Sequence, residues 1–276
     1  MTIRALARRV VPRPVRDVVR PYLRGRRRAT RSRVTGPTKA EASLGKLLAP
    51  YLPTDHSRQV QAVHYVDQLM RATPTPRAVM DLGCGVGDSV DLFRSYDPSV
   101  DWVGVDIPWS PEALARQRTD ARFVTYDGTA LPFPDATFDL IYSRQVLEHV
   151  RNVSLHLAEV RRVLRPGGAF IGSTSQLEPY HSRSLWNFTP LGFIELIEEA
   201  GMRVVELRPG IDGITLVMRS YLRRPAAFGR WWSADSPLNL LIDEWGRQTG
   251  QGPREVNLRK LQFCGQFAFL TRRPER

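Results

Sequence analysis

Residues 78–88 of this 276-residue chain read Ala-Val-Met-Asp-Leu-Gly-Cys-Gly-Val-Gly-Asp. The short apolar run that ends at Asp81 predicts a buried parallel strand. Three glycines spaced two residues apart then allow the backbone to turn tightly before a predicted helix over residues 88–94. Strand, glycine turn and helix start together form a cradle in which a nucleotide-like ligand can lie against backbone amides.

The side chains around this turn indicate which ligand it takes. A dinucleotide-binding fingerprint needs a third small residue where this chain has Asp88, whose carboxylate would face a pyrophosphate. The Lys-Ser or Lys-Thr ending of a phosphate-binding loop is also missing, which argues against ATP and GTP. Acidic residues on both sides of the turn, Asp81 and Asp88, instead favour a cation such as a sulfonium with an amino-acid tail. The alternative is an ordinary glycine-rich turn of an α/β protein.

Further apolar segments follow at the spacing of alternating strands and helices. The next one ends in Asp106, twenty-five residues after Asp81, where a carboxylate can accept hydrogen bonds from a ribose diol. Segments that read as the second to fifth strands cover residues 102–105, 122–125, 138–143 and 169–174. The alternation predicts an α/β protein with a mostly parallel sheet.

These motifs resemble, in the same order, those of the class I S-adenosylmethionine-dependent methyltransferases of the type 11 group, over residues 78–174. The resemblance implies a Rossmann-like fold, with a seven-stranded, mostly parallel sheet covered by helices on both faces. It implies S-adenosylmethionine as the cofactor. Residues 127–133, Asp-Gly-Thr-Ala-Leu-Pro-Phe, match the segment that holds the adenine in that family. Asp127 would then take the exocyclic amine, and Leu131 would cover the ring.

The resemblance also implies a set of cofactor-binding residues, carried over position by position from the matching motifs. They lie at the glycine turn, at the end of the second strand, in the adenine segment and at the end of the fourth strand. The set is Asp81, Gly83, Cys84, Gly85, Asp106, Ile107, Asp127, Gly128, Leu131 and Ser143.

Composition predicts one catalytic domain with extensions, because 42% hydrophobic residues in a chain of this length can bury a single substantial core. Two cysteines are too few for a disulfide framework, so a reducing cytoplasm is the expected setting. No apolar run is long enough to cross a bilayer, and the start lacks the apolar core of a signal peptide. We expect a basic arm over residues 1–34, a linker and helical cap over 35–77, and the methyltransferase domain over 78–276.

The net charge of +12 is concentrated in the arm. Residues 1–34 contain twelve arginines and one acidic residue, so the remaining 242 residues carry a net charge of only +1. Apolar residues recur at helical spacing among these arginines, which favours short amphipathic helices on an anionic membrane surface. A basic arm without fixed structure is an equal alternative. RNA binding comes third, because the arm contains one aromatic residue, Tyr22. The expected location is the cytoplasm, peripheral to the membrane.

The chain after the fifth strand predicts a helix over residues 191–200, with Thr189 as its N-cap and Pro190 at its start. Strand six is expected over residues 202–207 and strand seven over residues 263–270. About fifty residues lie between them, and an insertion at about 211–260 is rich in Trp and Leu. Such a segment suits a lid over the acceptor, a homodimer face, or a helical pair that extends the core.

Candidate catalytic side chains lie beyond the fourth and fifth strands, at the sheet edge where open α/β proteins bind ligands. His149 follows strand four, and Glu178 and His181 follow strand five. His181 is the favoured general base. For His149 two roles stay open, a catalytic one and a supporting one at the helix start. No ligand spacing is specific enough to assign a metal, so none is predicted.

The segment 176–188 combines an acid, a histidine, hydroxyls, an arginine and aromatic residues, a mixture that suits sugar rings. It resembles the acceptor-side loop of methyltransferases of bacterial glycan and polysaccharide assembly. The preferred prediction is O-methylation of a hydroxyl of a sugar, glycolipid or polysaccharide precursor. Alternatives are methylation of a lipophilic quinone or polyketide, RNA methylation guided by the arm, and a non-catalytic scaffold that binds the cofactor. An Asn-Pro-Pro-Tyr signature for nitrogen methylation is missing after strand four, which reads Tyr-Ser-Arg-Gln.

Overall fold

The computed structural model of this protein describes residues 39–275. The predicted basic arm, residues 1–34, lies outside the described residues. The described part forms a seven-stranded sheet in the order β3-β2-β1-β4-β5-β7-β6. Only β7 runs antiparallel to its neighbours, β5 and β6. The strands are β1 Ala78–Leu82, β2 Asp101–Asp106, β3 Arg122–Thr125, β4 Phe138–Arg144, β5 Leu164–Ser175, β6 Arg203–Pro209 and β7 Gln266–Arg272.

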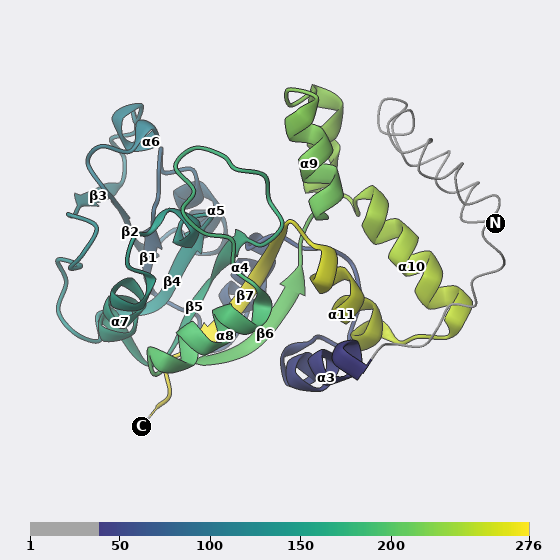
Figure 1. Ribbon diagram of the computed structural model, residues 1–276. Coiled ribbons are helices and arrows are strands. Elements are labelled where there is room, and N and C mark those ends of the chain that lie inside the picture. The colour runs from purple at the N-terminus through teal and green to yellow at the C-terminus, as the bar shows by residue number, and fades with distance from the viewer. Residues whose placement is uncertain (1–38, 276) are drawn as a thin grey trace.

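Helices cover both faces of this sheet, as predicted (Figure 1). On one face α7 (Val153–Val163) and α8 (Pro190–Glu199) contribute to the larger apolar core. On the other face α4 (Val63–Met70) and α5 (Ser89–Tyr96) contribute to a second core. The further helices before β5 are α3 Lys39–Leu48, η2 Ala49–Tyr51, α6 Pro111–Leu114 and η3 Leu147–His149.

The strands divide their side chains between the two cores by strict alternation. In β1, Met80 belongs to the core under α7 and α8, whereas its neighbour Val79 belongs to the core under α4 and α5. Phe170 and Ile171 of β5 divide in the same way. Because successive residues of a strand point to opposite faces, a strand buried on both sides reads as an unbroken apolar run. That pattern made the parallel strands recognisable in the sequence.

Helix α7 begins after Asn152, whose side chain accepts a hydrogen bond from Leu155 N at 3.2 Å. Two predicted strand boundaries were wrong. Strand seven begins at Gln266, because Phe263 is the last residue of a helix. Strand five begins at Leu164 rather than Ala169, and pairs with Phe138 there. The predicted cap of α8 is confirmed, since Thr189 Oγ1 accepts from Gly192 N at 3.1 Å.

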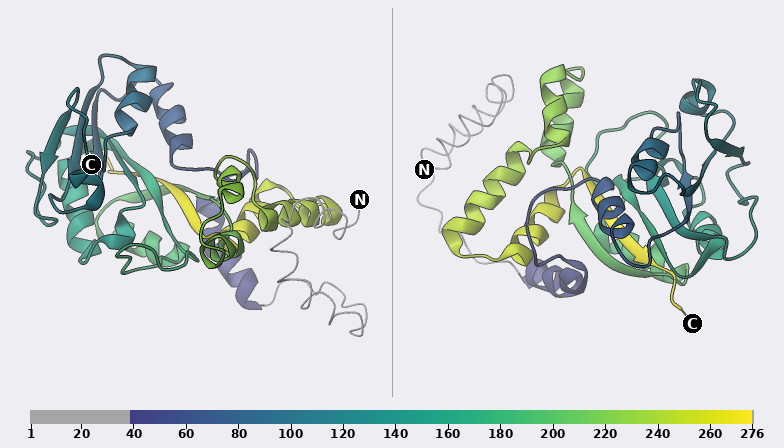
Figure 2. Two further views of the ribbon diagram at one scale, coloured as in Figure 1. Left: turned by 90° about the horizontal axis from the view of Figure 1, so that it is seen from above. Right: turned by 180° about the vertical axis from the view of Figure 1, so that it is seen from behind.

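The segment between β6 and β7 is helical and lies at the β6 end of the sheet, far from β3 (Figures 1 and 2). It consists of α9 Gly213–Tyr221, η4 Ala226–Trp232, α10 Pro237–Thr249 and α11 Pro253–Phe263. A small apolar cluster of its own includes Leu216, Met218 and Phe228. The predicted Trp-rich insertion is therefore a folded helical unit and not a loop.

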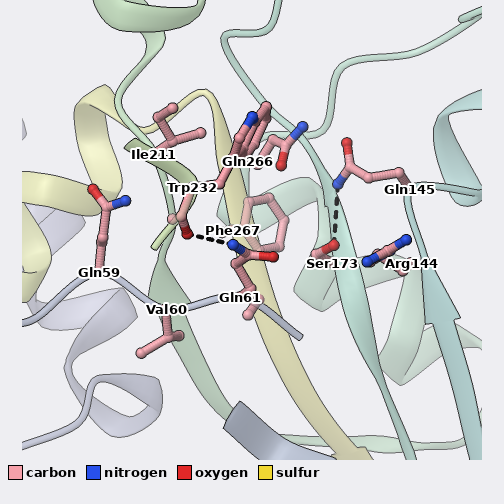
Figure 3. Close-up of a pocket in the computed structure, with 12 residues that line it drawn as sticks. Gln59, Val60, Gln61, Arg144, Gln145, Ser173, Ile211, Trp232, Gln266 and Phe267 are labelled. Atoms are coloured by element: carbon pink, nitrogen blue, oxygen red, sulfur yellow. Dashed lines mark hydrogen bonds between the residues drawn. The ribbon is translucent and has the colours of Figure 1, made fainter. Parts of the chain in front are cut away.

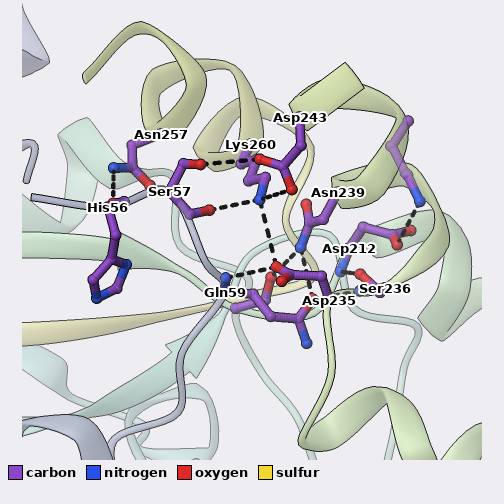
Figure 4. Close-up of polar contacts among 12 residues, drawn as sticks. His56, Ser57, Gln59, Asp212, Asp235, Ser236, Asn239, Asp243, Asn257 and Lys260 are labelled. Atoms are coloured by element: carbon purple, nitrogen blue, oxygen red, sulfur yellow. Dashed lines mark hydrogen bonds and ion pairs between the residues drawn. The ribbon is translucent and has the colours of Figure 1, made fainter. Parts of the chain in front are cut away.

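A buried lysine holds this unit against the segment that precedes α4 (Figure 4). Lys260 of α11 has 0% relative exposure, and its Nζ donates to Ser57 O at 2.5 Å. The same ammonium lies 2.8 Å from Asp243 Oδ2 and 3.4 Å from Asp235 Oδ1. Gln59 N donates to Asp235 Oδ1 at 2.8 Å, which closes the network. The insertion is thus attached by polar contacts between segments that are far apart in sequence.

Among residues 39–275, no helix is both long enough and apolar enough to cross a membrane.

Candidate active site

The glycine turn after β1 has the backbone geometry that only glycine adopts readily. Gly83, Gly85 and Gly87 have φ values of 78°, 52° and 88°. A Cβ at Gly83 would lie 2.3 Å from Val146 Cγ2, so the position has no room for a side chain. The turn therefore brings the backbone itself to the carboxyl edge of the sheet.

Asp106, at the end of β2, contacts this turn through one carboxylate oxygen and its own following residue through the other. Its Oδ2 accepts from Gly85 N at 2.8 Å, and its Oδ1 accepts from Ile107 N at 2.7 Å. A carboxylate oxygen has further lone pairs, so Asp106 can still accept hydrogen bonds from a ribose diol. The predicted pairing of the glycine turn with the acid of the second strand is thus present in space.

Asp81 is more enclosed than the sequence indicated. Its carboxyl is buried, and Ser89 Oγ of the following helix donates to it. Burial raises the pKa of Asp81 to about 7, an effect that the Ser89 hydrogen bond opposes. Beside it, burial raises the pKa of the Cys84 thiol to about 12, so this thiol is neutral and unreactive. Asp81 and Cys84 are thus buried side chains at the glycine turn.

The adenine segment lies against the end of β2. A Cβ at Gly128 would be 3.7 Å from Ile107 Cγ2, which places these two predicted residues side by side. Asp127 is exposed, and its Oδ1 accepts from Thr129 N at 2.8 Å and Ala130 N at 3.2 Å. These hydrogen bonds lower the pKa of Asp127. Leu131 packs into the larger core, so its side chain is mostly covered by protein.

Two observations show that this cradle fits S-adenosylmethionine. Ser143, near the end of β4, is buried, and its Oγ has no partner among the described residues. A buried hydroxyl without a partner is costly, and a polar ligand atom would satisfy it. In addition, Asp106 and Asp127 each keep unused acceptor capacity. Every predicted cofactor residue lies on β1, β2 or β4 or on the loops that leave β1, β2 and β3.

The three predicted catalytic residues come together beyond β4 and β5. The rings of His149 and His181 meet edge to face with centroids 5.3 Å apart. His181 Nδ1 lies 3.7 Å from Glu178 Oε1. The loop 176–188 is fastened to the segment after β4, since Leu185 N donates to Glu148 O at 2.7 Å and Trp186 Nε1 donates to Val150 O at 2.8 Å. These contacts bring residues that are far apart in sequence into one cluster.

A fourth member of the cluster, Glu148, was not predicted as a site residue. It has 0% relative exposure, and burial raises the pKa of its carboxyl to about 7. Its oxygens lie 3.1 Å from Thr174 Oγ1 and 3.1 Å from Ser175 Oγ. Ser175 Oγ also lies 2.7 Å from Glu178 Oε2. With one hydroxyl proton, Ser175 can donate to only one of these two carboxyl groups at a time.

Polar side chains connect this cluster to a cavity of about 280 Å³ at the same edge of the sheet. Figure 3 shows Gln61 and Trp232 on one side of the cavity, with Gln145 and Ser173 on the other. Gln266, which also lines it, donates through Nε2 to Glu178 Oε2 at 2.6 Å. The lining combines side-chain amides, a hydroxyl, a guanidinium and an indole with apolar residues that include Val60, Ile211 and Phe267. These residues come from β4, β5, β7, the insertion and the segment before α4.

The cluster also contains a set of groups that a divalent ion can use. Glu148, His149 and His181 offer ligand atoms that lie within 4.8 Å of one another. However, both oxygens of Glu148 already interact with hydroxyls, and its pKa of about 7 leaves it partly protonated at neutral pH. These hydrogen bonds and this proton compete with an ion for the same carboxyl group.

Sequence reasoning missed residues that have no motif of their own. Arg116 Nε donates to Gly85 O at 2.8 Å, and its guanidinium stacks 4.1 Å from the centroid of the Phe123 ring. Gln61 and Trp232 line the cavity although they lie 171 residues apart. Glu148 carried a usable signal, because an acid directly before a candidate histidine falls at the same sheet edge.

Comparison with known proteins agrees with this geometry. The methyltransferase domain family matches residues 80–172, which run from β1 into β5. A "Probable S-adenosylmethionine-dependent methyltransferase" of Mycolicibacterium smegmatis is 35% identical over 140 residues, covering 46% of this chain and 52% of that protein. The demethylmenaquinone methyltransferase of Thermus thermophilus is 33% identical over 101 residues, covering 35% of this chain and 46% of that protein. The chain spans about half the length of the curated relatives it matches.

Among solved structures, the phosphoethanolamine N-methyltransferase 2 of Haemonchus contortus in complex with S-adenosyl-L-methionine has a similar fold. Its TM-score is 0.50 at 16% identity, over 77% of this chain and 52% of that chain. The sheet order and the glycine cradle define a Rossmann-like class I methyltransferase domain. The matched residues 80–172 therefore form a methyltransferase domain, and the cofactor of such a domain is S-adenosylmethionine.

Proposed function

We propose that this protein transfers the methyl group of S-adenosylmethionine to a hydroxyl of a sugar-containing acceptor, a glycolipid or polysaccharide precursor. The cofactor supplies an electrophilic methyl group on a sulfonium. The protein's own task is to position an acceptor oxygen, exclude water and remove the hydroxyl proton. The observation that carries the proposal is the Glu178–His181 pair beside a cavity lined by amides, a hydroxyl and an indole.

The hydrogen bonds of His181 favour its role as the base. Its Nδ1 faces Glu178 Oε1 at 3.7 Å and Pro179 O at 3.4 Å, and both of these atoms are acceptors. The proton of the neutral ring is therefore most favourable on Nδ1, which leaves Nε2 with a lone pair to accept the hydroxyl proton. Glu178 is held in turn by Ser175 Oγ at 2.7 Å and Gln266 Nε2 at 2.6 Å.

The cavity supports a hydroxyl-rich acceptor group. Side-chain amides both donate and accept hydrogen bonds, as sugar hydroxyls do, and an indole offers a flat apolar face to a ring. Its volume of about 280 Å³ lies near the lower end of the range for ligand pockets, which suits one ring rather than a whole lipid. The exposed Tyr180, Leu185 and Trp186 of the neighbouring loop would contact the rest of an amphipathic acceptor.

A lipophilic acceptor of the quinone type is the second candidate. Relatives from Thermus thermophilus and Deinococcus radiodurans at 33% and 35% identity are named demethylmenaquinone methyltransferase. The exposed apolar residues around the loop 176–188 would suit such a molecule as well.

A transfer assay with methyl-labelled S-adenosylmethionine distinguishes the two candidate acceptors. The purified chain is incubated with sugar-lipid precursors and, separately, with a demethylated quinol, and the products are identified by mass spectrometry. We expect a labelled methyl ether on the sugar. Label on the quinol alone would replace the first proposal with the second, and label on nitrogen would reject both.

A further inference from the structure

The outer face of α9 is apolar although it faces solvent. Ile214, Val217 and Tyr221 have relative exposures of 53%, 50% and 72%. Their spacing of three and four residues places them on one stripe of the helix. Leu216 and Met218, on the opposite side of the helix, are buried against the rest of the insertion. A surface helix normally presents polar residues outward, so this stripe indicates a contact that residues 39–275 do not supply.

The charges around this stripe all have the same sign. From Gly213 to Trp232 the chain contains four arginines and no acidic residue. None of the four, Arg219, Arg223, Arg224 and Arg230, forms an ion pair with any residue in the range 39–275. Arg219 instead lies 5.7 Å from the centroid of the Trp232 ring. An apolar stripe flanked by arginines that have no acidic partner within residues 39–275 complements a surface that is anionic outside and apolar beneath.

The segment that carries the stripe also borders the cavity. Gly210 and Ile211, which lead into α9, line that cavity, as does Trp232 at the end of the segment. Figure 1 shows α9 standing clear of the sheet, above the end of β6. A surface that binds this face would therefore lie beside the opening to the acceptor cavity.

We propose that α9 and the arginine-rich turn after it dock on an anionic phospholipid bilayer. The docking goes beyond the proposed methyl transfer and stands without it, because it concerns a different surface. Its consequence for function is that a membrane-borne acceptor would reach the cavity without leaving the bilayer entirely.

The test is sedimentation of the full chain with vesicles of phosphatidylcholine, alone or mixed with phosphatidylglycerol. Measurements at about 0.5 M salt suppress the long-range attraction of the basic arm, because the Debye length falls well below 10 Å. The variant is Ile214→Ser, Val217→Ser and Tyr221→Ser together. The matched control replaces three equally exposed apolar residues of other elements: Leu47→Ser, Leu114→Ser and Leu155→Ser, whose exposures are 56%, 73% and 54%.

We expect wild type and control to bind the mixed vesicles, and the α9 variant to bind at least tenfold more weakly with unchanged affinity for S-adenosylmethionine. Unchanged affinity would show that the variant is folded. Wild type that fails to bind the mixed vesicles, or an α9 variant that binds like the control, would overturn the proposal. A wild-type dimer that becomes monomeric in the variant would also overturn it, because the stripe would then contact a second copy of the chain.

Discussion

Asp106 joins the second strand to the glycine turn through Oδ2, which accepts from Gly85 N, while its Oδ1 accepts from Ile107 N. Asp106→Ala removes two charge-assisted hydrogen bonds and the expected partner of the ribose diol, each worth about 1.5–3 kcal/mol. We expect at least tenfold weaker binding of S-adenosylmethionine by calorimetry. Asp101→Ala, at the exposed start of the same strand, is the control and should bind normally. Equal affinities in the two variants would contradict the assigned role of Asp106.

Glu148 makes the stability of the fold depend on pH. Its folded pKa of about 7 lies above the ordinary value of 4.5 for a glutamate, so between these values the folded chain holds a proton that the unfolded chain releases. Stability is therefore greatest at the acid end of this window and falls as the pH rises to about 7. The loss amounts to on the order of 3 kcal/mol from this one group.

Urea unfolding at pH 5, 6, 7 and 8 measures this effect. Asp81 contributes a change of the same sign, because burial also raises its pKa to about 7. The comparison is therefore between wild type and Glu148→Gln, which lacks the titrating group. We expect a shallower decline of stability with pH in the variant, and parallel curves would show that Glu148 is not responsible.

The Glu148, His149 and His181 cluster permits a direct test of metal dependence. Because hydroxyl hydrogen bonds already occupy Glu148, we expect methyl transfer to survive dialysis against EDTA with less than a twofold change. The measurement is turnover before dialysis, after dialysis, and after addition of Mg²⁺ or Zn²⁺. Activity that is lost and then restored by one ion would assign that ion to these three residues.

At the scale of elements, the insertion depends on one buried ion pair network. Lys260→Ala would leave Asp235 and Asp243 without their cation, which typically costs about 3–5 kcal/mol. We expect a loss of that size in urea unfolding, whereas Lys46→Ala on the exposed side of α3 should change stability little. Lys260→Met combined with Asp235→Asn and Asp243→Asn should recover part of the loss. No recovery would indicate that the ammonium stabilises the fold through Ser57 O instead.

The parallel half of the sheet could be predicted from sequence because local patterns determine it. A strand buried on both faces reads as an apolar run, and the glycines of the first turn have positive φ angles. The start of β7 could not be predicted, because apolar residues recur from Leu261 to Ala268, across the end of helix α11 and into the strand. Periodicity cannot separate a helix end from a strand start over so few residues.

At the scale of the whole molecule, one part of the candidate site could also be predicted from the sequence and the other part could not. The predicted cofactor-binding residues follow one another in chain order at strand ends, so motifs can identify them. The cavity, in contrast, combines Gln61, Gln145, Trp232 and Gln266 through long-range packing. The Lys260 network that positions two of its walls has no sequence signature. The acceptor side therefore follows from the fold and could not be predicted from the residues alone.

At the same scale, charge is distributed unevenly along the chain. Residues 35–276 carry a net charge of only +1, yet four arginines gather between Gly213 and Trp232 without an acid. Both this segment and the arginine-rich residues 1–34 suit an anionic surface, which agrees with a proposed acceptor that is itself a lipid.

The most direct test of hydroxyl methylation is turnover of His181→Ala on a sugar-lipid acceptor, beside wild type. A general base contributes typically 10²- to 10⁴-fold. We predict a fall in kcat of that size, an unchanged Kd for S-adenosylmethionine, and a methyl ether as the wild-type product. A variant with wild-type kcat, or a wild-type product methylated on carbon or nitrogen, would contradict the account.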